Sequence, residues 1–431
     1  MLNRAILALL VSFLTSVAAA QNVSNRGKLF WVGHMGHIDG TGSNFALYIT
    51  TDASTNAIVR VSIPGGTYTN LVVVPSNQVV VVTLPSAQTY MNCTDCIRNQ
   101  GVKIESLNHD IVVYAHIYSN ARSDATLLIP VETLGKEYYA IAFTQSPSSG
   151  TQRSEFMLVG VEDSTFIDIY PTVDVLPNKP KDTKYTVMLN TGEVYHAQSL
   201  TDVTGTRIVA RSADGIACKK VAAFSGSSFT RVGCANATTG DNLYQQLFPT
   251  TSWGQEFVTA PLKSRNGDQF RVLAKYDSTR LVINGGTPIY LDEGEHHSFV
   301  SYEANYIVTD KPVTLAQYPR TQNCDGNTGD PTLIVIPPIE QMVKYVAMYS
   351  SPYQNITGQY LNIITRTTDT AKFRLDGQKI VFTAMSNKPQ FAYAQQTVSS
   401  GIHRMNSDSF FQVVSYGFGN VEAYGYAGGT N

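Results

Sequence analysis

The same series of strand-like segments recurs along this chain in one fixed order, and this repetition constrains the fold more than any single motif. Each copy opens with an alternating segment led by an aromatic residue: Phe45, Phe156, Phe270 and Tyr360. A turn rich in Gly or Asn, a second apolar segment and a proline-containing segment follow. The prolines are Pro130, Pro249 and Pro337, each with an aromatic residue eight positions later. This pattern predicts about three and a half copies of a module of roughly 90 to 115 residues.

Apolar and polar residues alternate within these segments, as in NFALYITT at 44–51 and RLVINGG at 280–286. A period of two is typical of β-strands, because successive side chains point to opposite faces. Turn residues separate the segments, and no stretch keeps an apolar period of 3.6 over three turns. We therefore predict an all-β protein of tandem antiparallel modules with about six or seven strands each. A sandwich-like array is favoured, and a closed propeller-like ring is the alternative, since repetition around an axis also hides strand edges.

The start of the chain predicts a secretory signal peptide at 1–20. Arg4 precedes the apolar run AILALLVSFL, and Ala18–Ala20 supply the small residues of a cleavage site. The remainder divides into β repeat 1 at 21–150, β repeat 2 at 151–262, β repeat 3 at 263–350 and a partial β repeat 4 at 351–431. No later stretch approaches 18 uninterrupted apolar residues, so we expect a secreted, extracellular protein without membrane insertion.

Composition narrows the range of partners and modifications. Charged residues make up 15% of the chain, and its formal net charge is −2. Lys and Arg form no cluster, so the chain lacks the basic surface that nucleic acids and anionic membranes attract. Four Asn-x-Ser/Thr sequons fall in expected loops or at the terminus and are candidates for N-glycosylation. They are Asn22, Asn92, Asn236 and Asn355.

Five cysteines predict disulfides in an exported protein, and their odd number leaves one thiol free or paired between chains. Cys93 and Cys96 have the spacing of a redox or half-zinc motif. A βαβ context and a second ligand pair are missing, so a local or structural disulfide is favoured. Cys234 and Cys324 occupy corresponding loops of repeats 2 and 3, which makes a bridge between repeats one option. A bridge between Cys218 and Cys234 is the other.

Two segments resemble metal-binding sequences, but neither predicts a metal site. His34, His37 and Asp39 would converge on a helix, whereas side chains alternate along a strand. We interpret this trio as part of an exposed loop in front of the first repeat. The segment 325–330, DGNTGD, begins like a calcium loop. The twelfth position of that loop is Ile336 instead of Glu, and its flanks are strand-like, so a Gly/Asn turn is favoured.

Acidic residues recur in the modules without predicting catalysis. Three stand just ahead of the proline-segment strand, where an Asp that begins a turn is expected: Asp124, Asp241 and Asp330. Three others recur around the proline segment: Glu132, Glu256 and Glu340. A catalytic pair of carboxylates has no reason to appear once per module. The chain also lacks a nucleophile elbow, a Walker loop, a Rossmann glycine signature and a His-Glu-x-x-His helix, so we expect no enzyme, no metal and no cofactor.

Several segments resemble the N-terminal domain family of IgG-Fc-binding proteins. The matching pieces follow one order over most of the chain: GKLFWVG, ATLLIPVETLGKEYYAIAF, DVTGTRIVA, VAAFSG, LFPTTSWGQEFV, LAQYPRTQNCDGNTGDPTLIVIPPIEQ and EAYGYAGG. The resemblance implies a secreted, β-rich, non-enzymatic domain associated with adhesion and mucus. The favoured function is therefore an extracellular module that binds a protein or glycan through exposed loops. One alternative is a structural component of mucus, matrix or coat, linked by an intermolecular disulfide. Another is a carbohydrate-binding or carbohydrate-active protein.

Overall fold

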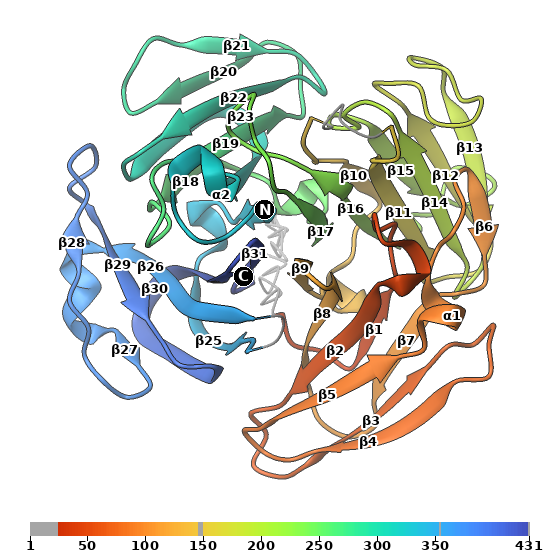
Figure 1. Cartoon of the computed structure of the whole chain (residues 1–431), viewed down its shortest axis with the longest axis horizontal. Coiled ribbons are helices and arrows are strands. Elements are labelled where there is room, and N and C mark those ends of the chain that lie inside the picture. The colour runs from red at the N-terminus through yellow and green to blue at the C-terminus, as the bar shows by residue number, and fades with distance from the viewer. Residues whose placement is uncertain (1–24, 145–149, 353–354, 430–431) are drawn as a thin grey trace, which may run out of the picture.

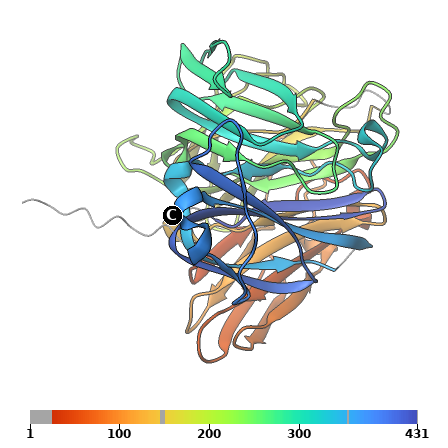
Figure 2. The same cartoon turned by 90° about the vertical axis from the view of Figure 1, so that its left-hand side faces the viewer.

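The computed structural model describes residues 25–144, 150–352 and 355–429. The predicted signal peptide and Asn22 lie outside the described residues. Strands dominate, as the sequence predicts, and four groups of strands surround a central axis (Figure 1). We call these groups modules 1 to 4 in chain order. In the side view, module 4 lies between module 3 and module 1 (Figure 2). Within the described ranges, the helices are too short to cross a membrane.

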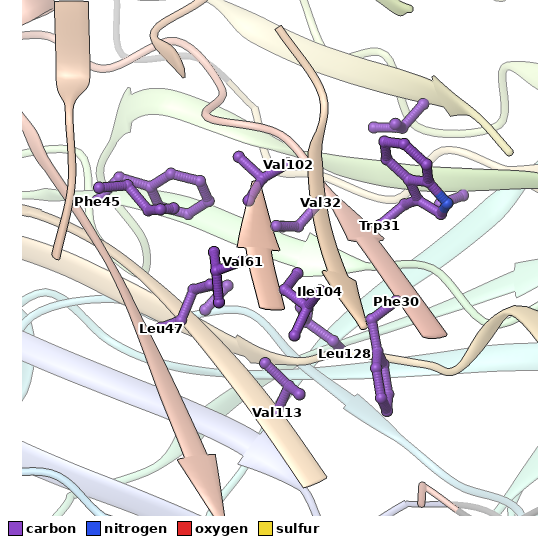
Figure 3. Close-up of a cluster of buried hydrophobic side chains, with 14 of the residues drawn as sticks. Phe30, Trp31, Val32, Phe45, Leu47, Val61, Val102, Ile104, Val113 and Leu128 are labelled. Atoms are coloured by element: carbon purple, nitrogen blue, oxygen red, sulfur yellow. The ribbon is translucent and has the colours of Figure 1, made fainter. Parts of the chain in front are cut away.

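Module 1 consists of two four-stranded antiparallel sheets with the orders β1-β7-β3-β4 and β5-β2-β8-β9. Its strands are β1 (Leu29–Val32), β2 (Asn44–Thr50), β3 (Ala57–Ser62), β4 (Thr69–Val74), β5 (Val79–Leu84), β7 (Val102–Ser106), β8 (Val112–Ser119) and β9 (Arg122–Leu127). Both sheets contribute to one buried apolar cluster, in which Phe30 and Ile104 of the first sheet join Phe45 and Leu47 of the second (Figure 3). The module is therefore sandwich-like.

Module 2 has the same two-sheet plan, with the orders β10-β15-β12-β13 and β17-β16-β11-β14-β6. Its own strands are β10 (Glu137–Tyr139), β11 (Ser154–Gly160), β12 (Thr165–Tyr170), β13 (Tyr185–Leu189), β14 (Val194–Ser199), β15 (Arg207–Arg211), β16 (Val221–Thr230) and β17 (Asp241–Gln246). The last strand of the second sheet, β6 (Cys96–Arg98), comes from the module 1 part of the chain and pairs antiparallel with β14. Module 1 thus covers an edge that module 2 would otherwise leave open.

Modules 3 and 4 each form one seven-stranded antiparallel sheet. Module 3 contains β18 (Gly254–Thr259), β19 (Asp268–Ala274), β20 (Thr279–Ile283), β21 (Ile289–Leu291), β22 (His296–Ser301), β23 (Asn305–Pro319) and β24 (Ile334–Ile336). Module 4 contains β25 (Val343–Ser350), β26 (Ile356–Arg366), β27 (Arg374–Leu375), β28 (Thr383–Ala384), β29 (Phe391–Thr397), β30 (Gly401–Gly419) and β31 (Glu422–Ala427). One long strand in each, β23 or β30, pairs with strands of both layers, so the two layers join into a curled sheet.

Helical segments are confined to the connections between strands. They are α1 (Ser86–Thr89), α2 (Gln322–Asp325) and the 3-10 turns η1 (Gly40–Gly42), η2 (Val131–Thr133), η3 (Thr250–Ser252), η4 (Ile339–Gln341) and η5 (Thr367–Lys372). The all-β prediction is confirmed. Modules 1 and 2 are sandwich-like, as favoured from the sequence, and modules 3 and 4 are single curled sheets; the four stand in the propeller-like ring that was the alternative.

The structural modules are offset from the predicted repeats. The strand that follows each proline segment pairs with the next module: β10 with β15, β18 with β23, and β25 with β30. The repeat boundaries predicted at 150, 262 and 350 place these strands one repeat too early. Likewise, β1 is the first strand of module 1. Module 4 has seven strands and is a complete module, whereas the sequence predicted a partial fourth repeat. Chain order alone does not reveal this offset, because the pairing partners lie far apart in sequence.

A glycine at the start of three modules packs against a proline at the end of the same module. A Cβ atom added to Gly27 would lie 2.5 Å from Cβ of Pro130. Gly135 makes the same approach to Pro249, and Gly254 approaches Pro338. No larger residue fits at this distance, so the glycines let each proline segment close back onto its own module.

The inner strands β9, β17, β24 and β31 lie around the axis, where side chains bind the backbone of a neighbouring module. Tyr244 N donates to Asp124 Oδ2 at 2.9 Å, which joins module 2 to module 1. Gln245 Nε2 donates to Gly425 O at 3.0 Å, which joins module 2 to module 4. These bonds satisfy polar backbone groups that the sheets leave unpaired.

A tyrosine cluster closes the ring between module 4 and module 1. The rings of Tyr48 and Tyr349 are 4.9 Å apart, and those of Tyr114 and Tyr426 are 4.7 Å apart. The hydroxyl of Tyr114 donates to Ala347 O at 3.1 Å. Aromatic packing with satisfied hydroxyl groups therefore joins the first and last modules.

Candidate functional site

The candidate site lies where the segment 86–98 of module 1 meets module 2. A disulfide between Cys93 and Cys96, with Cα atoms 6.1 Å apart, closes a turn in this segment. The chain then enters β6, where Cys96 lies opposite His196 of β14. The hydroxyl of Thr94 donates to Leu176 O at 3.4 Å. This junction holds the segment against module 2 and borders two cavities.

The first cavity has a volume of ≈ 250 Å³. Both modules contribute to its lining, which is mostly polar. The lining residues are His37, Ile38, Tyr90, Met91, Asn92 and Cys93 from module 1, and Thr151, Arg153, Gln198 and Ser228 from module 2. We call this the junction cavity.

Hydrogen bonds between the modules hold the walls of the junction cavity. Ile38 N donates to Ser228 O at 3.0 Å, and Arg153 N donates to Ser228 Oγ at 2.9 Å. The ring Nδ1 of His196 lies 2.7 Å from Cys93 O. The walls are therefore formed before any ligand enters.

A buried carboxylate, Glu155, lies next to the junction cavity. It is fully inaccessible; its Oε2 accepts a hydrogen bond from Gln198 Nε2 at 2.7 Å and lies 3.0 Å from His196 Nε2. A side chain at position 36 would collide with this carboxylate, so Gly36 permits the approach. Because the amide nitrogen of Gln198 is engaged, its Oε1 is left as a hydrogen-bond acceptor at the cavity.

Arg153 supplies the formal charge of the junction cavity. Its Nη1 donates to Gly150 O at 2.8 Å and to Gln152 O at 2.7 Å, which fixes the guanidinium group. The lining contains no Asp or Glu, and in the described part of the chain no ion pair joins Arg153 to a carboxylate. The guanidinium group of Arg153 therefore offers a cationic partner for an anionic ligand group, while the carboxyl group of Glu155 lies behind Gln198.

The two histidines that the sequence placed in an exposed loop are buried instead, whereas Asp39 of the same trio is exposed as expected. His34 is inaccessible, and its ring nitrogens lie 3.1 Å from Thr89 Oγ1 and 3.0 Å from Ser43 Oγ. The side chain of His37 is also covered, and its Nδ1 accepts a hydrogen bond from Asp39 N at 3.1 Å. Burial lowers the pKa of His34 to about 3 and that of His37 to about 4. Both rings are packing residues, and His37 also lines the junction cavity.

The second cavity is an open groove of ≈ 700 Å³ in module 2. It is lined by the long connection between β12 and β13, at 173–181, and by 199–201 at the end of β14. Lys179 at its edge lies 3.5 Å from Asp95, so the groove adjoins the disulfide-closed turn. Its lining includes the exposed side chain of Leu200.

The structure pairs four of the five cysteines. Besides Cys93 and Cys96, it joins Cys234 to Cys324, which is the option of a bridge between repeats. This bridge connects the β16–β17 loop of module 2 to α2 of module 3. Cys218 is unbridged and exposed, and Lys136 Nζ donates to its Sγ at 3.4 Å.

The calcium-like segment 325–330 is filled by a protein cation. Arg265 Nε lies 2.8 Å from Asp325 Oδ2, and both side chains are fully covered. Arg265 Nη1 donates to the carbonyl oxygens of Thr328 and Gly329 at 2.8 and 2.9 Å. The guanidinium group thus uses the oxygen atoms that a calcium ion would need. Across the described residues, no group of three or more His, Cys, Asp or Glu side chains is placed to hold a metal ion.

The sequence predicts that the recurring aspartates begin turns. Asp124 and Asp241 instead lie in strands β9 and β17, and all three are buried at the axis. Asp124, Asp241 and Asp330 are each 0% exposed, and Glu422 of module 4 joins them at 1%. Each module thus contributes one carboxyl group. Burial raises the pKa of Asp124 and Asp241 well above the usual range, and nearby Glu422 raises that of Asp241 further. Burial also raises the pKa of Glu422 to about 8.

Of the remaining candidate acids, Glu340 lies beside the strand that carries Glu256, since its Oε1 accepts a hydrogen bond from Gln255 N at 3.0 Å. Glu132 and Glu340 stand in the 3-10 turns η2 and η4 at the ends of modules 1 and 3, and Glu256 is exposed on β18. None of these three lines the junction cavity. The described sequon residues Asn92, Asn236 and Asn355 are all exposed, so their glycosylation stays a prediction.

The fold is a propeller-like ring of disulfide-containing β modules, and its sequence matches a known family. The model described as IgGFc binding protein matches residues 124–417, so this chain belongs to that family and the predicted resemblance is confirmed. Human IgGFc-binding protein is 24% identical over 335 residues. The match covers 72% of this chain and 6% of the human protein, so the chain spans a small part of that relative.

Among solved structures, a GH78 family rhamnosidase of Bacillus sp. GL1 was compared with this chain. It is 10% identical and covers 76% of this chain and 55% of its own, with a TM-score of 0.11. A score this low carries no argument about fold or activity.

Arg153, Glu155 and Gln198 were not predicted from the sequence. Glu155 does carry a signal, because it shares a strand face with Met157 and Val159, which are buried against module 1. A carboxylate in a strand that is apolar on both faces needs a buried hydrogen-bonding partner, because burying it unpaired costs free energy. That partner, His196, is 41 residues away, and only the sheet pairing identifies it.

Proposed function

We propose that this protein is an extracellular, non-enzymatic binding module that attaches to a partner protein or glycan. Membership of the IgGFc-binding protein family supports a binding role. Two disulfides support an oxidising, extracellular compartment, where such bonds persist. The observation that carries the proposal is the junction cavity, a preformed polar site whose walls come from two modules.

A non-enzymatic role is proposed because Glu132, Glu256 and Glu340 do not line one cavity together; Glu340 lines a cavity with Asp369 and Asp408, but neither of the other two acids does. Glycoside hydrolysis needs two carboxyl groups on either side of one bond. Glu132, Glu256 and Glu340 are distributed over separate segments, and the acid beside the junction cavity, Glu155, is fully buried. Recognition without bond cleavage fits this arrangement better.

The test is capture from the extracellular fluid in which the protein occurs. The immobilised chain is incubated with that fluid and, in parallel, with an immunoglobulin Fc fragment, because the human relative is named for that ligand. Bound molecules are identified by mass spectrometry, and a set of glycosides is screened for hydrolysis. We expect specific capture that weakens in Arg153→Glu and persists in the control Arg280→Glu, which alters an exposed residue of module 3. Hydrolysis, or the absence of any specific ligand, would refute the proposal.

A second candidate function, a cross-linked component of mucus, matrix or coat, is favoured by one observation. Cys218 is exposed and unbridged, which leaves a thiol for a disulfide between chains. Reducing and non-reducing gels of the secreted protein separate the two proposals. Disulfide-linked oligomers that disappear in Cys218→Ser support the coat, whereas a monomer under both conditions excludes it.

A further inference from the structure

We infer that the junction cavity binds a carboxylated monosaccharide, presented as the terminal sugar of a glycan. The inference rests on the proposed binding function and names the ligand class of the same site. Three properties of the cavity lead to it: its charge, its size and the kinds of groups that line it.

The positive charge of Arg153 favours a ligand that carries a carboxylate. Arg153 is a cation at a cavity without a lining carboxylate, and its side chain is held by two backbone carbonyl oxygens. Glu155, the nearest buried acid described above, accepts a hydrogen bond from Gln198 and lies beside His196. A carboxylate ligand would therefore find a fixed guanidinium partner with hydrogen bonds to spare.

The size and the remaining lining select a sugar. A volume of ≈ 250 Å³ lies below the 300–1,000 Å³ or so of typical ligand pockets, so one ring fits better than an oligosaccharide. Hydroxyl and amide groups of Ser228, Asn92 and Gln198 supply donors and acceptors for sugar hydroxyls. The side chain of Tyr90 adds apolar surface for the carbon atoms of the ring.

The walls are rigid enough to select between similar sugars. The disulfide of Cys93 fixes one wall, and Ile38 and Ser228 tie the modules together across the cavity. Tyr90 is also held, because its hydroxyl lies 3.3 Å from both N and O of His37. A site that is already ordered loses little entropy on binding, which favours a small ligand.

The test is a titration of the full secreted chain with free sugars, followed by calorimetry or ligand-observed NMR. The probes are N-acetylneuraminic acid and glucuronic acid, with galactose and glucose as neutral controls. The protein is produced in a host that adds no N-glycans, because Asn92 is a sequon residue at the cavity and an N-glycosidase would convert a glycosylated Asn92 to Asp. We expect one or both acids to bind and the neutral sugars to bind at least about tenfold more weakly.

Variants connect this binding to the cavity. Arg153→Gln should weaken binding of the acid by about ten- to a hundredfold, since a charge-assisted hydrogen bond is lost. Arg153→Lys should retain part of the affinity, and Arg280→Gln all of it. A thermal unfolding curve for each variant verifies that it is folded. Equal binding of neutral sugars, no binding of either acid, or full affinity in folded Arg153→Gln would each overturn the inference.

The two proposals fail in distinguishable ways. If the chain captures an extracellular partner but binds neither acid, the sugar inference is wrong and the binding function stands. If it captures no partner and binds no sugar, both are wrong.

Discussion

The interior of module 1 and the axis between the modules are both fully buried, yet they are held by different chemistry. Between the two sheets of module 1, Phe30, Phe45 and Ile104 pack in a core of mostly apolar side chains (Figure 3). At the axis, Asp124 and Gln245 bind the backbone of neighbouring modules, and further carboxyl groups are buried beside them. The core tolerates an approximate fit of apolar side chains, whereas each axial group needs a particular partner.

The difference between the core and the axis arises at the edges of the β-sheets. Within a module, the ladders pair the backbone and leave only side chains to be buried. Where inner strands of different modules meet, no ladder joins β9 to β17, and backbone groups there need side-chain partners. The polar bonds at the axis therefore add to apolar clusters that also run from one module into the next.

The largest expected effect is the loss of a core side chain. Phe45→Ala removes a fully buried ring and should lower the free energy of unfolding by about 3–5 kcal/mol. Chemical denaturation followed by tyrosine fluorescence or circular dichroism measures it. Leu71→Ala is the matched control, because Leu71 is 60% exposed and should change stability by less than about 0.5 kcal/mol. Equal effects of the two substitutions would contradict the assignment of the core.

The next effect concerns the covalent link between modules 2 and 3. Replacing both Cys234 and Cys324 by Ser opens a loop with a sequence separation of 90 and should cost about 2–4 kcal/mol. The same double replacement of Cys93 and Cys96, with a separation of 3, should cost less, since a short loop loses little entropy on closure. Thermal unfolding of the two double variants compares the bridges. A greater loss for the shorter loop would show that strain or packing outweighs chain entropy.

Asp124→Ala tests the polar axis. Asp124 accepts hydrogen bonds from the N–H groups of Ala125, Tyr244 and Leu333 and lies beside the Thr332 hydroxyl. Removing it leaves buried donors unpaired, and we expect a loss of about 1–3 kcal/mol. Asp124→Asn should not reach the stability of the original chain, because the NH₂ group of Asn would face backbone N–H donors where Asp offers an acceptor oxygen. If Asn were as stable as Asp, the carboxyl group would not be the required acceptor. Denaturant titration measures all three proteins.

The smallest expected effect is a difference in the pH dependence of stability between a buried carboxyl group at the axis and an exposed one. Folding raises the pKa of Glu422 from its usual value near 4.5 to about 8. Between about pH 4.5 and pH 8, the folded chain therefore holds a proton at Glu422 that the unfolded chain has lost. Stability from this group is therefore present at low pH and declines as pH rises. The buried histidines act in the opposite direction below about pH 6.5, because their folded-state pKa values are lowered.

Between pH 6.5 and 8, Glu422→Gln should flatten the decline by on the order of 1 kcal/mol. Glu256→Gln, at an exposed position, serves as the control and should leave the slope unchanged. Unfolding free energies measured across this pH range verify the sign. A steeper decline in Glu422→Gln would mean that the carboxyl group does not carry the proton.

Much of the fold was predictable from the sequence, but little of the candidate site was. The alternation around Phe45 and Phe270 predicts strands, and both residues lie in the cores of strands β2 and β19. The exposed loop predicted at His34 and His37 is wrong, because a local pattern does not show that Thr89 and Ser43 fold over His34. The junction cavity escaped prediction for the same reason. Its walls come from positions more than a hundred residues apart.

The sequence by itself determined the all-β class, the repetition, the family and the number of cysteines. Each of these depends on residue types and on their spacing within one segment. Such spacing can be recognised in the sequence because side chains alternate along a strand. Tertiary structure alone decided that the modules stand in a ring, that strands after Pro130 and Pro249 belong to the next module, and that four carboxyl groups meet at the axis. These features depend on pairing between distant segments, whose partners are selected by burial and hydrogen bonding in the folded chain.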